Sequence, residues 1–570
     1  MFYQRAMQLY CAGLQHQIST TTVCWALCCL LGASAVIADT LPNAGSLQQN
    51  IQTGREVNRP AMPPTSNLPP LLPKQMARGG PTLTVNQFKW LGNSLFSNQE
   101  LDSLTAASLG QKMDFAQLES VAASIANHYR AAGYVVQTKL PAQDILNGVV
   151  TIEITEATFG KVLMDGPNSK RVDIARIQQT IYQFQPSGSK LNVNKIDRAL
   201  AVLSDLAGIR VQGQLLQGAE SGQTDFIVST QDWTVVNIES SVDNSGARST
   251  GQDRLAMGLT LNSPLGMGDQ LSANALVTKG SDYFRAAYRW PMGYAGWKLG
   301  LNGSQLNYKV TDAAFSALPL QGSANAYGLE STYPLAWRSR FKLISVLGWD
   351  VKNYNNLRDA QVVSSYVTRA VNVGVQSHVF DPLGVGGFTT WQVVATGGEL
   401  ARKIDTADSL IEGRYDKIKY TLNSTQELTA RLSFQATLNG QTSQSNLDSS
   451  EKFYLGGLSG VRAYPSSEGG GSKGQLLNLE LRHKLNNNST WFVFYDHGQV
   501  AVNPSSIDAL NTYVYKGYGM GYGHVSDKGI NLKASVATRL GQNPNPTSTG
   551  QDQDGSLITN RFWFSASLPL

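Results

Sequence analysis

The chain has 570 residues, a formal net charge of +5 and a mean hydropathy of −0.20. This length accommodates several domains. The nearly balanced charge excludes the strongly basic footprint of a nucleic-acid-binding protein, so no nucleic-acid partner is expected. The four cysteines, Cys11, Cys24, Cys28 and Cys29, all lie near the N-terminus. If that region is removed on export, the remaining chain can hold neither a disulfide framework nor a thiolate metal site.

The N-terminal segment has the pattern of a secretory signal peptide. An uncharged apolar run of roughly 15 residues begins at Val23, and Arg5 is the only charge before it. Val36 and Ala38 supply small residues at the two positions that a signal peptidase inspects. We therefore predict a signal peptide over residues 1–38. The alternative, a membrane anchor, is disfavoured because the run is short for a bilayer span and no basic flank follows it.

Residues 39–59 have the weak amphipathic pattern of a short helix. Leu47 and Ile51, with Val57, fall on one side of that helix. Residues 60–82 are rich in proline, which sustains neither a helix nor a central strand. We therefore predict an extended linker there.

Residues 83–157 have the pattern of a compact α/β module. The segment DFAQLESVAASIANHYRAAG has helical periodicity, with Asp114 placed to cap its start and Gly133 placed to end it. The segment VVTIEITEA, near the end of the module, alternates as a strand does. Residues 158–232 repeat a similar order of patterns, so we predict two tandem modules of periplasmic type.

From about Trp233 the helical period disappears. Alternating segments, about 16 of them, run to the C-terminus, and several approach the length that a tilted strand needs to cross an outer membrane. Short connections such as NNNS alternate with long ones such as QNPNPTSTGQDQDGS, as periplasmic turns and exterior loops do. Residues 233–570 therefore predict an antiparallel membrane β-barrel. A soluble β-sandwich or propeller is the alternative, which the signal peptide and the cysteine-free mature chain oppose.

One glycine-rich stretch raises the question of a functional loop. The sequence GLSGVRAYPSSEGGGSKG, residues 457–474, sets Arg462 and Tyr464 among glycines and serines. Taken alone, it has the composition of a solvated surface loop. It is not a phosphate-binding loop, because the pattern predicts no strand before it and no helix after it. The chain also has no G-x-S-x-G elbow, and its six histidines lack metal-ligand spacing, so neither enzymatic activity nor a cofactor is expected.

Several stretches are similar to one family. FKWLGNSLFSNQEL, IANHYRAAGYVV and, above all, LPAQDILNGVVTIEITEATFGKV (residues 140–162) resemble the POTRA domains of two-partner secretion transporters, the haemolysin secretion/activation proteins of the ShlB/FhaC/HecB type. Residues 158–232 resemble the second POTRA domain of that family. Residues 461–464, VRAY, resemble its V-R-G-Y loop motif, and residues 494–498, FYDHG, fit its F-x-D-x-G strand motif.

This resemblance implies roles for individual residues. Residues 453–474 would fold back into the barrel as a lumen loop, so that Arg462 meets Asp496 on the inner wall. Tyr464 and Gly498 belong to the same two motifs and would complete this lock. The resemblance also implies that the N-terminal helix, which carries Leu47 and Ile51, plugs the lumen.

The strand pattern supports the same pairing. In TWFVFYDHGQV, alternation places Phe492, Phe494 and Asp496 on one face, which therefore mixes apolar and charged residues. A twist or a bulge near Gly498 would turn Asp496 inward. A charge in a narrow lumen needs a partner, and a guanidinium can satisfy a carboxylate through two hydrogen bonds. An exposed Asp496-His497 pair at a strand end is the alternative, and a catalytic dyad is a weaker one.

Three positions depart from the family pattern. Ala463 stands where the family usually has glycine, and a positive φ there would be strained. Ala157 also replaces a common glycine. The chain ends on Leu570 instead of an aromatic residue, so Phe562 and Phe564 are the candidates for the signal that the barrel-assembly machinery recognises.

The resemblance implies an outer-membrane translocation pore with its POTRA domains in the periplasm. These domains would capture a large, unfolded secreted exoprotein, and the barrel would export it. Outer-membrane lipid, and the barrel-assembly machinery during biogenesis, are the other expected partners. The main alternative is an assembly or insertase-type member of the same superfamily. A diffusion pore, a siderophore receptor and an outer-membrane enzyme are weaker alternatives.

Overall fold

A computed structural model describes residues 42–53, 81–312, 319–338, 340–380, 383, 386–405, 411–504 and 511–569. The expected signal peptide over residues 1–38 lies outside the described residues, as does almost all of the expected linker over residues 60–82. Within the described part of the chain, no helix is long and apolar enough to span a bilayer.

The first α/β module packs two helices against a small mixed sheet. In chain order its elements are β1 (Leu83–Thr84), β2 (Gln87–Leu91), α3 (Asn98–Thr105), η1 (Ala106–Ser108), β3 (Lys112–Met113), α4 (Phe115–Ala131), β4 (Val136–Lys139) and β5 (Val149–Glu156). The sheet has the order β2-β5-β4, with β2 parallel to β5 and β4 antiparallel to it. Asp114 forms a capping box with Gln117 at the start of α4, and Gly133 follows its end with a φ of 87°, as the sequence predicts.

The second module repeats this plan. It comprises β6 (Thr158–Asp165), α5 (Ile174–Phe184), α6 (Val193–Ser204), β7 (Ile209–Gln217) and β8 (Gln223–Asp232), with the sheet order β6-β8-β7. Apolar faces of both helices and of the sheet form one core, in which Phe159, Ile177 and Phe226 are fully buried. The two modules therefore fold around separate cores.

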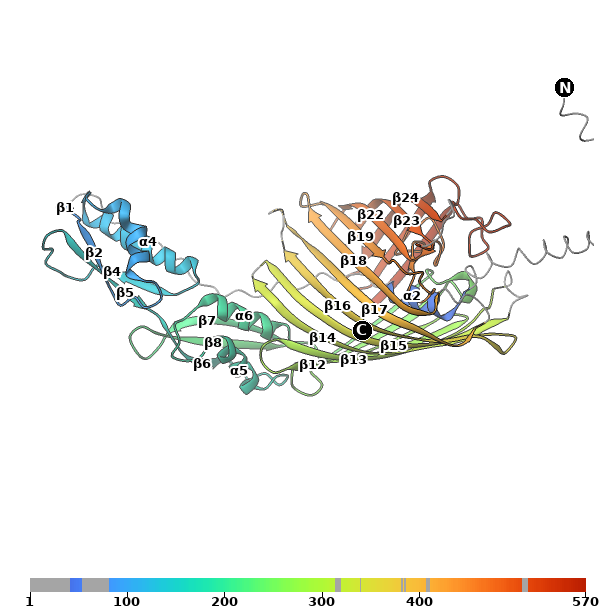
Figure 1. Ribbon diagram of the computed structural model, residues 1–570, viewed down its shortest axis with the longest axis horizontal. Coiled ribbons are helices and arrows are strands. Elements are labelled where there is room, and N and C mark those ends of the chain that lie inside the picture. Colours follow the sequence, from blue (N-terminus) through green and yellow to red (C-terminus); the bar gives the residue numbers. More distant parts are fainter. Residues whose placement is uncertain are drawn as a thin grey trace, which may run out of the picture.

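The remainder of the chain forms a closed antiparallel barrel of sixteen strands within the described residues, which confirms the predicted fold class. The strands are β9 (Val236–Asp243), β10 (Arg254–Asn262), β11 (Gln270–Val277), β12 (Ser281–Met292), β13 (Trp297–Lys309), β14 (Leu320–Arg338), β15 (Phe341–Arg358), β16 (Gln361–Phe380), β17 (Gly387–Asp405), β18 (Gly413–Glu427), β19 (Leu432–Thr442), β22 (Lys473–Lys484), β23 (Ser489–Ala501), β24 (Thr512–Val525), β25 (Asn531–Arg539) and β26 (Asn560–Pro569). Strand β26 pairs with β9 and closes the ring. The two modules project from one end of this barrel (Figure 1).

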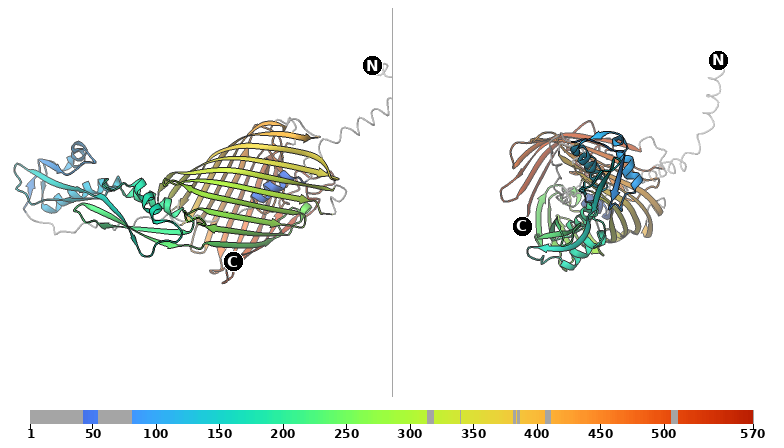
Figure 2. Two further views of the ribbon diagram at one scale, coloured as in Figure 1. Left: turned by 90° about the horizontal axis from the view of Figure 1, so that it is seen from below. Right: turned by 90° about the vertical axis from the view of Figure 1, so that its left-hand side faces the viewer.

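A short helix lies inside the barrel. Helix α2 (Ala44–Thr53) is enclosed by the strands in two views, towards the end of the barrel that is remote from the modules (Figures 1 and 2). Leu47 is buried in a cluster with wall tyrosines such as Tyr283 and Tyr354, and Ile51 packs against the same cluster. The apolar side expected from the sequence therefore faces the barrel wall, because that wall offers aromatic surface inside an otherwise polar lumen.

Candidate functional site

The segment that follows β19 folds into the barrel. This lumen loop spans residues 443–472, so it begins earlier than the expected 453–474 and ends where β22 begins. It contains a small hairpin of β20 (Phe453–Tyr454) and β21 (Gly470–Gly471). Its residues Leu455, Val461 and Tyr464 are fully buried against the wall. This burial rules out a solvated surface loop.

Arg462 and Asp496 are in direct contact. The Arg462 side chain is 5% exposed and Asp496 is fully buried. The Nε of Arg462 donates to Oδ2 of Asp496 at 2.9 Å and the Nη2 donates to Oδ1 at 2.7 Å, so the guanidinium grips both carboxylate oxygens. The backbone N–H of Arg462 adds a third bond to Oδ2 at 3.0 Å. The loop is thus anchored through both backbone and side chain at one residue.

A second carboxylate, which the sequence analysis missed, completes the guanidinium's partners. The Nη1 of Arg462 donates to Glu480 Oε1 at 2.5 Å, and Glu480 also accepts from Arg482 Nε at 2.9 Å. Asn478 donates to Asp496 Oδ1 at 2.7 Å. In the sequence NLELRHK these three wall residues alternate on one face of β22, and that alternation was the available signal.

Strand β23 presents Asp496 to the lumen without any irregularity. Its ladder runs in register with both neighbours, so the expected bulge near Gly498 is wrong. Phe492 and Phe494 share the buried face with Asp496, whereas Trp491, Val493 and Tyr495 are exposed on the outer face. Apolar residues can face this lumen because the loop covers them. The Arg462 guanidinium lies 3.5 Å from the Phe494 ring centroid, in cation–π geometry.

The alternatives raised for Asp496 and His497 do not fit this arrangement. The two side chains lie on opposite faces of β23, and Asp496 is fully buried, so they form neither an exposed strand-end pair nor a dyad. Across the described residues no cluster of three or more potential metal ligands occurs.

Tyr464 and Gly498 fill the rest of the lock region. The Tyr464 ring meets Tyr515 of β24 edge to face, with centroids 4.8 Å apart, and Arg539 lies 4.3 Å above its face. A β-carbon on Gly498 would come within 2.7 Å of Leu455 and 3.0 Å of Val461, both in the lumen loop. Gly498 therefore allows the loop to touch the wall.

Ala463 is accommodated without backbone strain. It is absent from the non-glycine residues of positive φ among the described residues. Its side chain is fully buried and faces Gly517 of β24, where an added β-carbon would lie 2.7 Å from the Ala463 methyl. The glycine missing from the loop motif is thus matched by a glycine in the facing wall.

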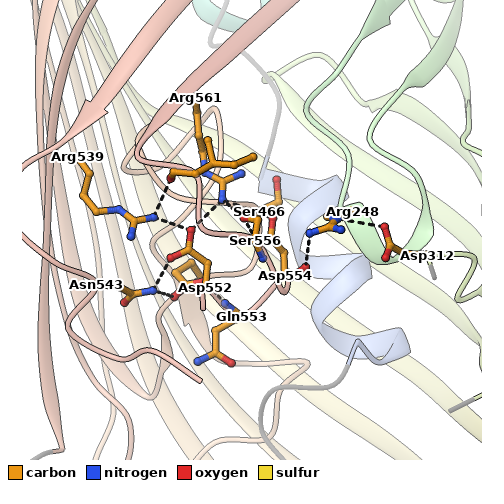
Figure 3. Close-up of polar contacts among 12 residues, drawn as sticks. Arg248, Asp312, Ser466, Arg539, Asn543, Asp552, Gln553, Asp554, Ser556 and Arg561 are labelled. Atoms are coloured by element: carbon orange, nitrogen blue, oxygen red, sulfur yellow. Dashed lines mark hydrogen bonds and ion pairs between the residues drawn. The ribbon is translucent and has the colours of Figure 1, made fainter. Parts of the chain in front are cut away.

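The exterior loop between β25 and β26, residues 540–559, also folds inward. Asp552 accepts from Arg539 at 2.5 Å and from Arg561 at 2.9 Å, which ties this loop to both flanking strands (Figure 3). Glu468 of the lumen loop accepts from Asn543 at 2.8 Å and from the backbone N–H of Gln553 at 2.9 Å. The sequence predicted this segment only as a long exterior loop, because its partner in the lumen loop, Glu468, is 75 residues from Asn543 in the sequence.

Helix α2 contacts both the wall and the lumen loop. Its first N–H, at Ala44, donates to Asn356 of β15 at 3.0 Å. Asn50 donates to Ser467 of the lumen loop, and Gln49 donates to the carbonyl of Ser450. Polar contacts thus join helix α2 to the wall and to the lumen loop inside the barrel.

Comparison with known proteins places these features in one family. The model described as haemolysin secretion/activation protein ShlB/FhaC/HecB matches residues 222–523, and the ShlB-type POTRA domain matches residues 83–157. The "Heme/hemopexin transporter protein HuxB" of Haemophilus influenzae (strain 86-028NP) is 25% identical, over 73% of this chain and 75% of its own. The "Outer membrane transporter CdiB" of Dickeya dadantii (strain 3937) is 24% identical, over 70% of this chain and 72% of its own.

Solved structures show the same fold. CdiB from Escherichia coli superposes with a TM-score of 0.72 at 20% identity, covering 92% of this chain and 95% of its own. CdiB from Acinetobacter baumannii gives a TM-score of 0.66 at 18% identity, covering 92% and 96%.

Proposed function

This chain belongs to the ShlB/FhaC/HecB family of haemolysin secretion/activation proteins, and we propose that Arg462 and helix α2 hold its barrel closed until a partner polypeptide enters. The protein is a two-partner secretion transporter of the outer membrane, with its POTRA modules in the periplasm. Its family consists of transporters, which disfavours the assembly-type alternative and agrees with a function that is not enzymatic.

The partner is a secreted exoprotein, and its capture falls to the modules. Strand β7 forms one edge of the second sheet among the described residues. An extended, unfolded segment could add to such an edge, with main-chain hydrogen bonds giving affinity and side-chain pockets giving selectivity. Folding of the exoprotein outside the cell removes the unfolded species and makes passage one-way. Nothing in this cycle requires a cofactor.

We propose two further partners for the barrel. The outer face carries exposed apolar residues such as Leu347, Trp349 and Val373, which suit contact with outer-membrane lipid. The exposed Phe562 and Phe564 on the last strand are our candidates for recognition by the barrel-assembly machinery.

The observation that carries the gating proposal is the bidentate salt bridge between Arg462 and Asp496. Removing one partner of such a buried pair leaves an uncompensated charge and costs about 3–5 kcal/mol. Arg462→Ala should therefore leave the barrel inserted but reduce export of the co-expressed exoprotein at least tenfold, because the loop no longer returns to one defined position. Export is measured as exoprotein in the medium.

The chain offers a matched control for this experiment. Arg254 forms a bidentate salt bridge with Asp243, at 2.8 and 3.1 Å, but both residues belong to the wall. Arg254→Ala should leave export close to normal. Normal export by Arg462→Ala, with the protein present at wild-type level in the outer membrane, would contradict the proposed role of the loop.

A further inference from the structure

A turn of the lumen loop, far from Arg462, holds helix α2. This seat turn comprises residues 448–452, with the sequence Asp-Ser-Ser-Glu-Lys. The Asp448 carboxylate accepts from the N–H and the hydroxyl of Ser450 at 2.9 and 2.7 Å, and the N–H of Glu451 donates to the Asp448 carbonyl at 2.8 Å. These bonds close the turn and present Ser450 and Glu451 in fixed directions, and both residues are buried.

Glu451 ties the seat turn to the barrel wall. Its carboxylate accepts from Lys352 of β15 at 2.9 Å, and from Lys417 of β18. Gln441 at the end of β19 donates to its carbonyl at 3.0 Å. The side chains of Glu451 and Lys417 are almost entirely shielded from solvent, and that of Lys352 is only slightly exposed. The turn is thus fixed to strands that do not take part in the Arg462 contact.

The neighbouring residues of the turn hold the helix. Ser449 donates to the Asn43 side chain at 2.9 Å, just before α2, and the Ser450 carbonyl accepts from Gln49. The approach is so close that a β-carbon on Gly45 would lie 2.7 Å from the Ser450 β-carbon and 2.8 Å from its backbone. The first turn of α2 therefore packs directly on the seat turn, and glycine is needed there.

The surroundings of Glu451 make its charge necessary. A cavity of about 260 Å³ lies between Gln49 and Gln52 of α2 and the wall, and Lys352, Lys417 and Lys419 line it together with Glu451 and Asp350. Without the glutamate charge, Lys352 and Lys417 would lose the carboxylate that they share. Like charges around one small cavity repel each other, and each buried charge without a partner costs several kcal/mol.

We infer that Glu451 is a positioning residue for the plug, because its ion pairs with Lys352 and Lys417 hold the turn on which helix α2 rests. The inference rests on the proposed role of α2 as a plug. Loss of these pairs frees the seat turn and the helix together, whereas the Arg462 contact still holds the rest of the lumen loop.

The test uses the full chain, purified and reconstituted in planar bilayers. Glu451→Gln keeps the size and part of the hydrogen bonding but removes the charge. We expect the open probability of its pore to rise roughly tenfold or more, because loss of a buried ion pair exceeds the energy of one tenfold step. Glu451→Asp keeps the carboxylate charge that both lysines face, so its pore should stay close to the wild-type closed state.

A spin-label distance supplies a readout of helix position. The mature chain is expected to lack cysteine, so Gln52→Cys on α2 and Lys309→Cys at the end of β13 can be labelled alone. Glu451→Gln should broaden the distance distribution between these labels. Gly45→Ala should broaden it too, although it leaves every charge in place. Gly397→Ala is the control, since an added β-carbon there meets nothing within 4 Å.

The possible outcomes separate this inference from the function on which it rests. Deletion of residues 44–53 raises conductance if α2 plugs the lumen. If that deletion opens the pore whereas Glu451→Gln changes neither conductance nor distance, the proposed role of Glu451 is contradicted and the plug role of α2 is supported. If the deletion itself leaves conductance unchanged, the proposed plug role of α2 is contradicted, and so is the role of Glu451 that rests on it.

Discussion

At the scale of single residues, Arg462 works as a planar fork that meets two acidic wall residues at once. Asp496 takes two of its side-chain donors and Glu480 takes a third. Arg482 shares Glu480, so two cations and two anions balance in the buried cluster. A lysine could not reproduce this geometry, because its ammonium is a point charge without a fixed fork. The cluster therefore explains why the loop carries arginine at this position.

Gly498 sets how closely the lumen loop approaches the wall, and this leads to a prediction. Gly498→Ala should push Leu455 and Val461 away from the wall, loosen the loop and raise the basal conductance several-fold. The measurement is single-channel recording of the purified protein. Gly523→Ala, on the adjacent strand β24, is a suitable control because the nearest atoms to an added β-carbon there lie 3.8 Å away. Equal conductance in the two variants would show that the close approach does not matter.

At the scale of elements, Glu156 joins the two POTRA modules at the end of β5. Its buried carboxylate accepts from the N–H groups of Ser94 and Leu95 in the first module, at 2.7 and 2.9 Å. Lys190 of the second module lies 3.1 Å from it. Burial by itself would raise the pKa of Glu156, but the hydrogen bonds from Ser94 and Leu95 and the Lys190 contact outweigh burial and lower the pKa to about 2.

This lowered pKa predicts how the joint between the modules responds to pH. The carboxylate stabilises the joint fully above its ordinary pKa of 4.5, and the stabilisation is lost as the pH falls from 4.5 to about 2. Spin labels on the two modules should therefore give a narrow distance distribution at pH 5 that broadens towards pH 2. The distance distribution of Glu156→Gln should be broad at every pH. Glu153→Gln, on the opposite face of β5, should behave as wild type. A distance distribution of Glu156→Gln that matches wild type would contradict the role of Glu156 in the joint.

At the scale of the whole molecule, the second module is docked on the periplasmic turns of the barrel. Asp205, which follows α6, lies 2.6 Å from Lys298 and 2.8 Å from Lys342 of the barrel. Burial would raise the pKa of Asp205, but the two lysines outweigh it and hold the pKa well below its usual range. Arg198 of α6 also donates to the Pro334 carbonyl at 3.2 Å. These contacts hold the module at the mouth of the pore.

The docking contacts predict that the module and the pore act as one unit. Asp205→Lys would place three cations together, so it should broaden the distance between labels on the second module and on the barrel and lower export several-fold. Asp165→Asn, at an exposed position of the same module, is the control. Full export by an Asp205→Lys protein that shows a broadened distance would mean that fixed docking is dispensable for passage.

The same scale explains why the resting barrel needs internal segments. A barrel of about 16 strands leaves an aqueous channel when its interior is empty. Here α2, the lumen loop and residues 540–559 lie in the interior, and the lumen loop contacts the other two segments. In the proposed function, the barrel wall provides the pathway, and displacement of these three segments opens it.

The sequence by itself determined the local features of this protein. Period-two alternation predicted the strands and their two faces, and helical periodicity with Asp114 and Gly133 predicted α4. These signals are local, because each strand must place one face in lipid and each helix must satisfy its end groups within a few residues. The motif resemblance also singled out Arg462 and Asp496, which the structure brings together.

Only the tertiary structure decided which groups meet inside the lumen. Alternation along β22 marks the lumen face that carries Glu480, but it does not identify Arg462 as the partner. Glu451 shows no local signal of its role, and neither does the contact of residues 540–559 with Glu468, because these partners lie tens of residues away in the sequence. Closure of the ring brings β15, β18 and β22 around the same interior, and the cost of an unpaired charge there selects the partners. The bulge expected near Gly498 failed for the same reason: the loop covers Phe492 and Phe494, so a regular strand can turn them and Asp496 to the inside together.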